Sequence, residues 1–189
     1  MTLFFEDLKV GDRWTSLSRR VEREDVVDFA DLTGDHDPLH EGGGESGESP
    51  FGRPVVHGLL GLSVMAGLSS DSPAVKTLAL VRIGEWRFER PVYFGDSVHV
   101  LTEVAELNAY GRRAGRVIWH RSLVNQHGQT VQSGTLETLV ALRSRYAKHA
   151  ARDKHAAHAE DKSAIEPVIE QAAASRLQST LQPIAHRKP

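Results

Sequence analysis

Residues 51–70, FGRPVVHGLLGLSVMAGLSS, form a long apolar stretch in the first half of the chain. From Val55 to Leu68 this stretch is apolar almost all round, and a helix without a polar face is normally buried. Gly58 and Gly61 lower its helix propensity, so we expect its backbone to approach another group closely there. The sequence therefore predicts one long buried helix.

The residues after this helix are typical of strands. Four segments are rich in Val, Leu, Thr and aromatic residues, and turn signals separate them: 77–92, 96–107, 113–126 and 130–143. No helical crossover pattern lies between these segments, so a parallel sheet does not fit. We expect an α+β fold in which an antiparallel β-sheet wraps around the long central helix.

A second helix is predicted earlier in the chain, over residues 22–34 (EREDVVDFADLTG). It combines an apolar stripe of helical spacing with acidic residues in its first turn. Gly34 stands where a left-handed C-terminal cap belongs. The polar segment DHDPLH, from Asp35 to His40, therefore directly follows a helix end.

Composition limits the domain organisation and the classes of partner. The 189 residues are 40% hydrophobic and 25% charged, which suits one globular domain with some excess. We assign residues 1–143 to this domain and 144–189 to an Ala/His-rich polar tail, disordered or loosely helical. The net charge of −2 gives no general attraction to nucleic acid or to a membrane surface.

The same features predict where the protein works. No segment approaches the roughly 18 consecutive apolar residues of a membrane span. The first residues lack the basic start of a signal peptide, and the chain has no cysteine for disulfides or thiolate chemistry. We expect a cytoplasmic protein.

The DHDPLH segment allows three interpretations. A metal site is disfavoured, because Pro38 breaks the helix that would place His36 and His40 on one face, and no established zinc spacing is matched. We therefore predict no metal. A turn explains Asp37 and Pro38, since an acidic residue before proline satisfies local amides. It leaves Asp35 and His40 unexplained, and an acid–base centre is the third interpretation.

Two other motifs are excluded. Gly42, Gly44 and Gly47 match the nucleotide-binding pattern G-x-G-x-x-G. That motif needs a preceding strand and a following helix, which the sequence does not offer here, so we expect no nucleotide site. A serine hydrolase is unsupported because the chain has no G-x-S-x-G elbow.

His57 and Gly58 stand at the predicted start of the long helix. First-turn amide groups lack partners within a helix and could stabilise a developing oxyanion. His57 could equally cap the helix or pack against it. The residues alone leave both interpretations open.

Three segments, in this order, resemble blocks of the MaoC-like hydratases and dehydratases, relatives of the (R)-specific enoyl-CoA hydratases. TGDHDPLH resembles their D-x-N-P-x-H motif, FGRPVVHGLL their second block, and WRFERPVYFGDSV the strand after the central helix. EDLKVGD resembles their lead-in, and the likeness covers roughly residues 3–143. It implies a hot-dog fold, in agreement with the antiparallel sheet and central helix expected above.

The resemblance also implies a reaction, the reversible addition of water to a trans-2-enoyl-CoA to give a (R)-3-hydroxyacyl-CoA. Asp35 and His40 match the catalytic acid–base pair, and Gly58 matches the residue whose N–H forms the oxyanion hole. No cofactor is implied. Substrate contacts are expected from four further residues: Phe51, Gly52, Asp37 and His57.

The implied substrate is an acyl-CoA or acyl-carrier-protein thioester, and the implied assembly is a homodimer or a higher homo-oligomer. Asp37 departs from the family asparagine, and Ala66 replaces a serine of some members. Two alternative functions remain, a hot-dog acyl-CoA thioesterase and a non-catalytic acyl-thioester-binding hot-dog subunit.

Overall fold

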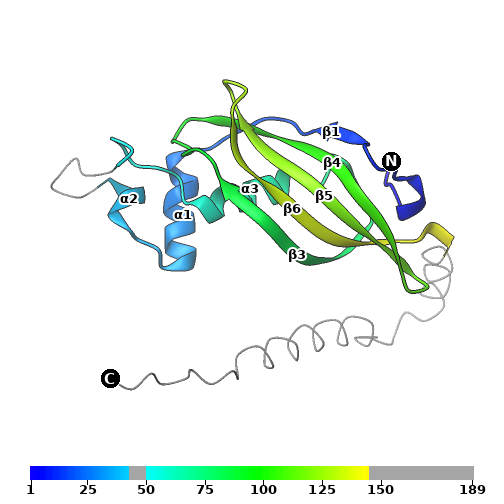
Figure 1. Cartoon of the computed structure of the whole chain (residues 1–189). Coiled ribbons are helices and arrows are strands. Elements are labelled where there is room, and N and C mark those ends of the chain that lie inside the picture. Colours follow the sequence, from blue (N-terminus) through cyan, green and yellow to red (C-terminus); the bar gives the residue numbers. More distant parts are fainter. Residues whose placement is uncertain (43–49, 145–189) are drawn as a thin grey trace, which may run out of the picture. The chain divides into compact units, whose positions relative to one another are not determined.

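The computed structural model describes residues 1–42 and 50–144, and Figure 1 shows their arrangement. The tail expected over 144–189 lies outside the described residues apart from Ser144. The helices are η1 (Phe5–Asp7), α1 (Arg23–Thr33), α2 (Pro38–Glu41) and α3 (Gly58–Leu68). The strands are β1 (Arg13–Thr15), β2 (Arg19–Arg20), β3 (Thr77–Phe88), β4 (Ser97–Tyr110), β5 (Ala114–Asn125) and β6 (Thr130–Ala141).

The strands form one antiparallel sheet in the order β1-β4-β5-β6-β3, with β2 also paired to β4. The α3 helix lies against one face of this sheet, as Figure 1 shows. Its Leu60, Val64 and Met65 belong to one buried cluster with Val100 of β4 and Leu123 of β5. The expected α+β architecture, an antiparallel sheet around a central helix, is confirmed.

Alternation along β4 explains why the sheet has one covered face. Val98, Val100 and Val104 are completely buried, whereas Leu101 between them is exposed. Successive side chains of a strand point to opposite faces, and fully burying a valine contributes about 1.5–3 kcal/mol. The apolar face therefore holds the sheet against α3 and the N-terminal segment. Within the described chain, no helix is long and apolar enough to span a membrane.

The start and the burial of α3 differ from the sequence expectation. The helix begins at Gly58, because its N-cap His57 has non-helical backbone angles (φ −52°, ψ 131°) and the amide of Val56 donates to the carbonyl of Val92 at 2.8 Å. Complete burial is also wrong, since Leu59 is 62% exposed and Ser63 and Ala66 are exposed too. The sheet covers only one side of α3. No described element of this chain covers the side that carries Leu59, Ser63 and Ala66.

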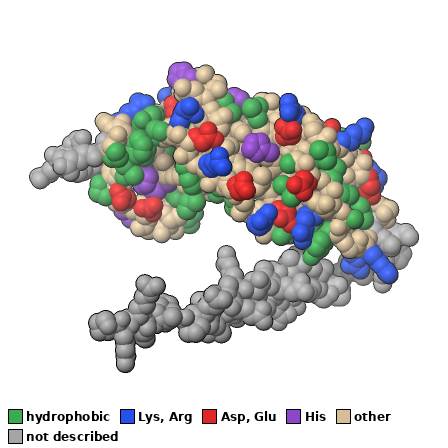
Figure 2. All heavy atoms as spheres, in the orientation of Figure 1, with side chains coloured by type: hydrophobic (Ala, Val, Ile, Leu, Met, Phe, Trp, Pro, Cys, Tyr) green, Lys and Arg blue, Asp and Glu red, His purple; other side chains and the backbone are tan. Residues whose placement is uncertain are grey.

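Charged side chains of both signs are interspersed over the molecular face in Figure 2. Glu137 of β6 pairs with Arg116 of β5 at 2.8 Å and with Arg82 of β3 at 3.4 Å. Side chains on neighbouring strands meet in this way across a sheet, and opposite charges there are favourable. These pairs occupy the face of the sheet opposite the apolar core.

Candidate active site

The end of α1 positions Asp35. Gly34 adopts a left-handed conformation (φ 76°), and its amide donates to the carbonyl of Ala30 at 2.7 Å. This is the C-terminal cap that the sequence predicted. The chain leaves the helix sharply, and the side chain of Asp35 is 53% exposed.

The short helix α2 positions His40. Pro38 is its first residue, where the missing N–H of proline costs nothing, and Asp37 is its N-cap. An Asp37 carboxylate oxygen accepts a hydrogen bond from the amide of Leu39 at 2.8 Å. Aspartate and asparagine cap helices about equally well, so this contact explains how Asp37 can replace the family asparagine. His40 follows in the last turn of α2.

A backbone carbonyl fixes the orientation of the His40 ring. The Nδ1–H group of His40 donates to the carbonyl of Val55 at 2.8 Å, because a carbonyl oxygen can only accept. In the neutral ring the proton is therefore on Nδ1, and Nε2 carries the lone pair. Hydrogen bonding of one ring nitrogen thus leaves the other available as a base.

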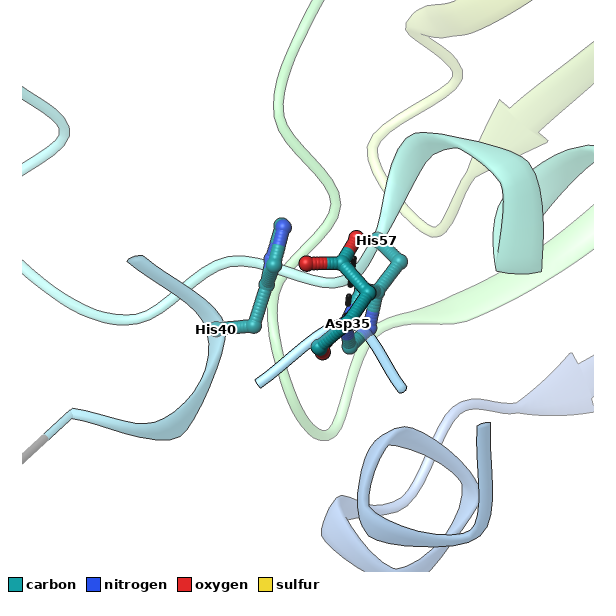
Figure 3. Close-up of side chains that lie close together, drawn as sticks. All are labelled: Asp35, His40 and His57. Carbon is teal, nitrogen blue, oxygen red and sulfur yellow. Dashed lines mark hydrogen bonds and ion pairs between the residues drawn. The ribbon is translucent and has the colours of Figure 1, made fainter. Parts of the chain in front are cut away.

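His57 lies directly behind the Asp35 and His40 side chains, and Figure 3 shows the three groups together. It is only 2% exposed, and its Nε2–H donates to the backbone carbonyl of Asp35 at 2.9 Å. Its ring stacks on the His40 ring, with centroids 3.8 Å apart and an angle of 26°. On its other side the ring of Phe29 lies 5.1 Å away. His57 therefore supports both members of the expected catalytic pair.

One nitrogen of His57 has no visible partner. Nδ1 is buried and makes no hydrogen bond with the described part of the chain. An unsatisfied buried polar atom costs about 1–3 kcal/mol of stability, and such costs concentrate at functional sites. The sequence indicated His57 as a substrate contact, but nothing in it showed that this ring stacks on His40.

Gly58 begins α3 beside this cluster. Its amide belongs to the first turn, where a helix offers no internal acceptor. A Cβ atom at this position would stand 2.9 Å from Cε1 of Phe88, so only glycine fits without displacing that ring. Figure 1 shows this end of α3 near α1 and α2, which carry the segment of Asp35 and His40.

A buried glutamine that the sequence interpretation missed anchors the same helix end. Gln132 of β6 is 2% exposed, and its side-chain amide donates to the carbonyl of Gly58 at 3.0 Å. Its Oε1 accepts a hydrogen bond from the indole N–H of Trp86 at 3.3 Å. This network fixes the first peptide unit of α3. The sequence feature that could have indicated this role was a glutamine next to the apolar Val131 in a predicted strand.

Of the expected substrate contacts, Phe51 and Gly52 lie in the turn before α3. Phe51 is 43% exposed, and Gly52 has a left-handed backbone (φ 69°) that favours glycine. The structure brings Asp35, His40 and His57 together.

Asp35, His40 and His57 each offer one potential metal-ligand atom, and these atoms lie within 4.8 Å of one another. The hydrogen bonding makes Nε2 of His57 unsuitable as a metal ligand. Nε2 of His57 carries the proton that it donates to Asp35, and a metal-binding nitrogen must be unprotonated. Moving that proton to Nδ1 would leave a buried donor without an acceptor. The cluster is better suited to proton transfer.

The class of protein follows from the sheet around α3 and from the acid–base cluster at the start of that helix. Hot-dog proteins have this arrangement of sheet and helix. A Mycobacterium tuberculosis protein described as having a double hot-dog fold aligns with a TM-score of 0.64 at 19% identity. That alignment covers 74% of this chain and 44% of the other. The chain has a hot-dog fold.

The family model described as the MaoC like domain matches residues 9–123. The chain therefore belongs to the MaoC-like family. The crystal structure of a MaoC-like dehydratase from Rhodospirillum rubrum aligns with a TM-score of 0.64 and 30% identity. It covers 75% of this chain and 98% of the other.

Two curated relatives are named as enzymes of acyl-CoA metabolism. The 3-hydroxybutyryl-CoA dehydratase of Methylorubrum extorquens is 36% identical over 115 residues, which are 59% of this chain and 70% of that protein. The (R)-specific enoyl-CoA hydratase of Aeromonas caviae is 34% identical over 103 residues, which are 54% of this chain and 75% of that protein. These likenesses support a lyase-type enzyme.

Proposed function

We propose that this protein is an acyl-thioester hydratase or dehydratase that adds water reversibly to a trans-2-enoyl-CoA. The observation that carries the proposal is that the Asp35 carboxylate lies close to the His40 ring, whose Nε2 is left as a base. The names of the relatives, one a dehydratase and one an (R)-specific hydratase, support the reaction and the (R) product. We also propose that it works in the cytoplasm.

In this proposal a water molecule lies between Asp35 and His40. Nε2 of His40 accepts a proton as the water oxygen attacks the β-carbon, while the Asp35 carboxylate orients the water. Negative charge develops on the thioester oxygen, where the first-turn amide of Gly58 donates a hydrogen bond. The acid–base pair then returns a proton to the α-carbon. The hydroxyl group and the hydrogen of one water are thus added across the double bond.

The other polar groups support this arrangement. Asp37 caps α2 and His57 holds the Asp35 backbone, and both also remain proposed contacts for the substrate. Phe51 and Gly52, which precede α3, remain our proposed contacts for the substrate. The chemistry needs neither a metal nor a redox cofactor, because proton transfer and oxyanion stabilisation suffice.

The test is to incubate the purified full chain with crotonyl-CoA and follow both the enoyl absorbance and the release of free thiol. Hydration removes the enoyl absorbance without releasing thiol, and chiral analysis of the product should give the (R) isomer. Thiol release would show a thioesterase instead. Binding of acyl-CoA without turnover across short, branched and long enoyl chains would show a non-catalytic subunit.

We further propose a homodimer, because β3 is an edge strand with an unusual number of exposed apolar side chains. They are Leu78, Leu80, Val81, Ile83 and Phe88. Exposed apolar edges promote association, and a second copy of the chain would cover this one. In light scattering, Leu80→Glu should give a monomer, whereas the control Leu101→Glu on β4 should not. A Leu80→Glu protein that remains dimeric would overturn this interface.

A further inference from the structure

A hollow of about 210 Å³ lies apart from the acid–base cluster, and arginine side chains line it. The segment before α3, the β3–β4 connection and the β5–β6 turn contribute its walls, and Figure 1 shows the two loops at the same end of the sheet. The charged and aromatic residues that line it are Arg53, Arg90, Tyr93, Asp96 and His127. The proposed hydration chemistry uses none of these residues.

Both arginines are held in place by contacts within the protein. The Arg53 guanidinium lies 3.6 Å from the centre of the Tyr93 ring, which fixes its plane. Nη1 of Arg90 donates to the carbonyl of Thr130 at 2.8 Å. A guanidinium carries five N–H donors in a fixed planar fork that matches phosphate oxygens. Arg90 thus has donors beyond the one it uses on Thr130.

Among the described residues that line the hollow, arginines outnumber acidic residues. Among the described residues that line it, Asp96 is the one acidic residue, and both of its carboxylate oxygens accept hydrogen bonds. Oδ1 accepts from the side-chain amide of Gln126 at 2.8 Å, and Oδ2 accepts from the amide of Tyr93 at 3.0 Å. Two guanidinium groups, and one carboxylate whose oxygens are both engaged, therefore line the described part of the hollow.

We propose that this hollow binds a phosphate group of the thioester carrier, and the inference rests on the proposed function. Arg53 stands two residues before Val55, so the Cα atoms of Arg53 and Val55 are at most about 7 Å apart. The carbonyl of Val55 orients His40. The amide of Val56 donates a hydrogen bond to the carbonyl of Val92 at 2.8 Å, and Val92 precedes Tyr93 of the hollow. One short segment thus links the phosphate site to the catalytic base. A carrier thioester likewise joins an acyl group to a phosphate, through a pantetheine arm.

The test compares crotonyl thioesters of CoA, phosphopantetheine and pantetheine on wild type and on the Arg53→Gln/Arg90→Gln double variant. Arg13→Gln, which removes one exposed charge on β1, is the control, together with the thermal midpoint of every protein. The double variant should raise KM for crotonyl-CoA by about tenfold or more, as expected for lost charge-assisted hydrogen bonds, and leave kcat nearly unchanged. KM for the pantetheine thioester, which has no phosphate, should not change.

The phosphopantetheine thioester identifies the source of the phosphate. If its KM also rises, the hollow binds the phosphate next to the pantetheine arm, which CoA shares with acyl-carrier proteins. If only the CoA thioester is affected, the hollow binds phosphates at the nucleotide end of CoA. Both results support the inference. An equal KM change for all three thioesters, or none, would overturn it.

Calorimetry with free CoA and free pantetheine separates this inference from the proposed reaction. Wild type should bind CoA more tightly than pantetheine, and the double variant should lose this preference. If CoA binds in this way but no enoyl thioester is hydrated, the phosphate site stands and the proposed reaction fails. If enoyl thioesters are hydrated but CoA has no advantage over pantetheine, the reaction stands and the phosphate site fails.

Discussion

Replacing His57 by phenylalanine should separate the stability of this protein from its activity. The variant keeps an aromatic ring to stack on His40 but removes the N–H that donates to the Asp35 carbonyl at 2.9 Å. Losing that hydrogen bond costs about 0.5–1.5 kcal/mol, whereas removing the unsatisfied Nδ1 recovers about 1–3 kcal/mol. The free energy of unfolding should therefore stay close to the wild-type value or increase.

Activity should respond in the opposite direction. Without His57 the carbonyl of Asp35 loses the donor that the structure gives it, and a displacement of about 1 Å at a catalytic group can cost about 100-fold in rate. We expect kcat for crotonyl-CoA to fall by about that factor while the thermal midpoint is maintained. The matched variant His57→Gln retains a donor without the ring, and it should keep more activity than His57→Phe. A His57→Phe enzyme with full kcat would refute the reasoning.

Two further predictions concern stability. Gly61→Ala would place a Cβ atom 2.2 Å from Nε2 of Gln132, so we expect the free energy of unfolding in urea to fall by about 1–2 kcal/mol. The control Gly67→Ala has open space around it and should be neutral or stabilising. Stability that Asp7 provides should be present above pH 3.8 and lost as the pH falls further, because a hydrogen bond from Arg143 lowers the pKa of that carboxyl from 3.8. In Arg143→Gln, NMR titration should show the pKa of Asp7 closer to 3.8.

The elements that the sequence predicted well depend on local patterns. The cap at Gly34 and the strand β4 each follow from a few neighbouring residues. Motif likeness identified Asp35 and His40, and the structure brings both against His57. Local pattern and family motif together were enough for the architecture and for this part of the candidate site.

The remaining features depend on contacts between distant residues. His40 and His57 are 17 positions apart, and nothing in either segment indicates that their rings stack. The hydrogen bond from the Gln132 side chain to the Gly58 carbonyl joins residues 74 positions apart and depends on how β6 packs under α3. The exposed side of α3 was missed because an apolar stripe looks the same whether this chain or a second copy covers it.

Hydration of crotonyl-CoA by Asp35→Asn, measured beside wild type, is the most direct test of the proposed acid–base pair. The variant keeps the size of the side chain and removes its charge, and because this side chain is half exposed, the circular dichroism spectrum and thermal midpoint should match wild type. Loss of the carboxylate should lower kcat at least about 100-fold, within the range typical of an acid–base group. Wild-type kcat in a folded Asp35→Asn protein would contradict the mechanism proposed for this site.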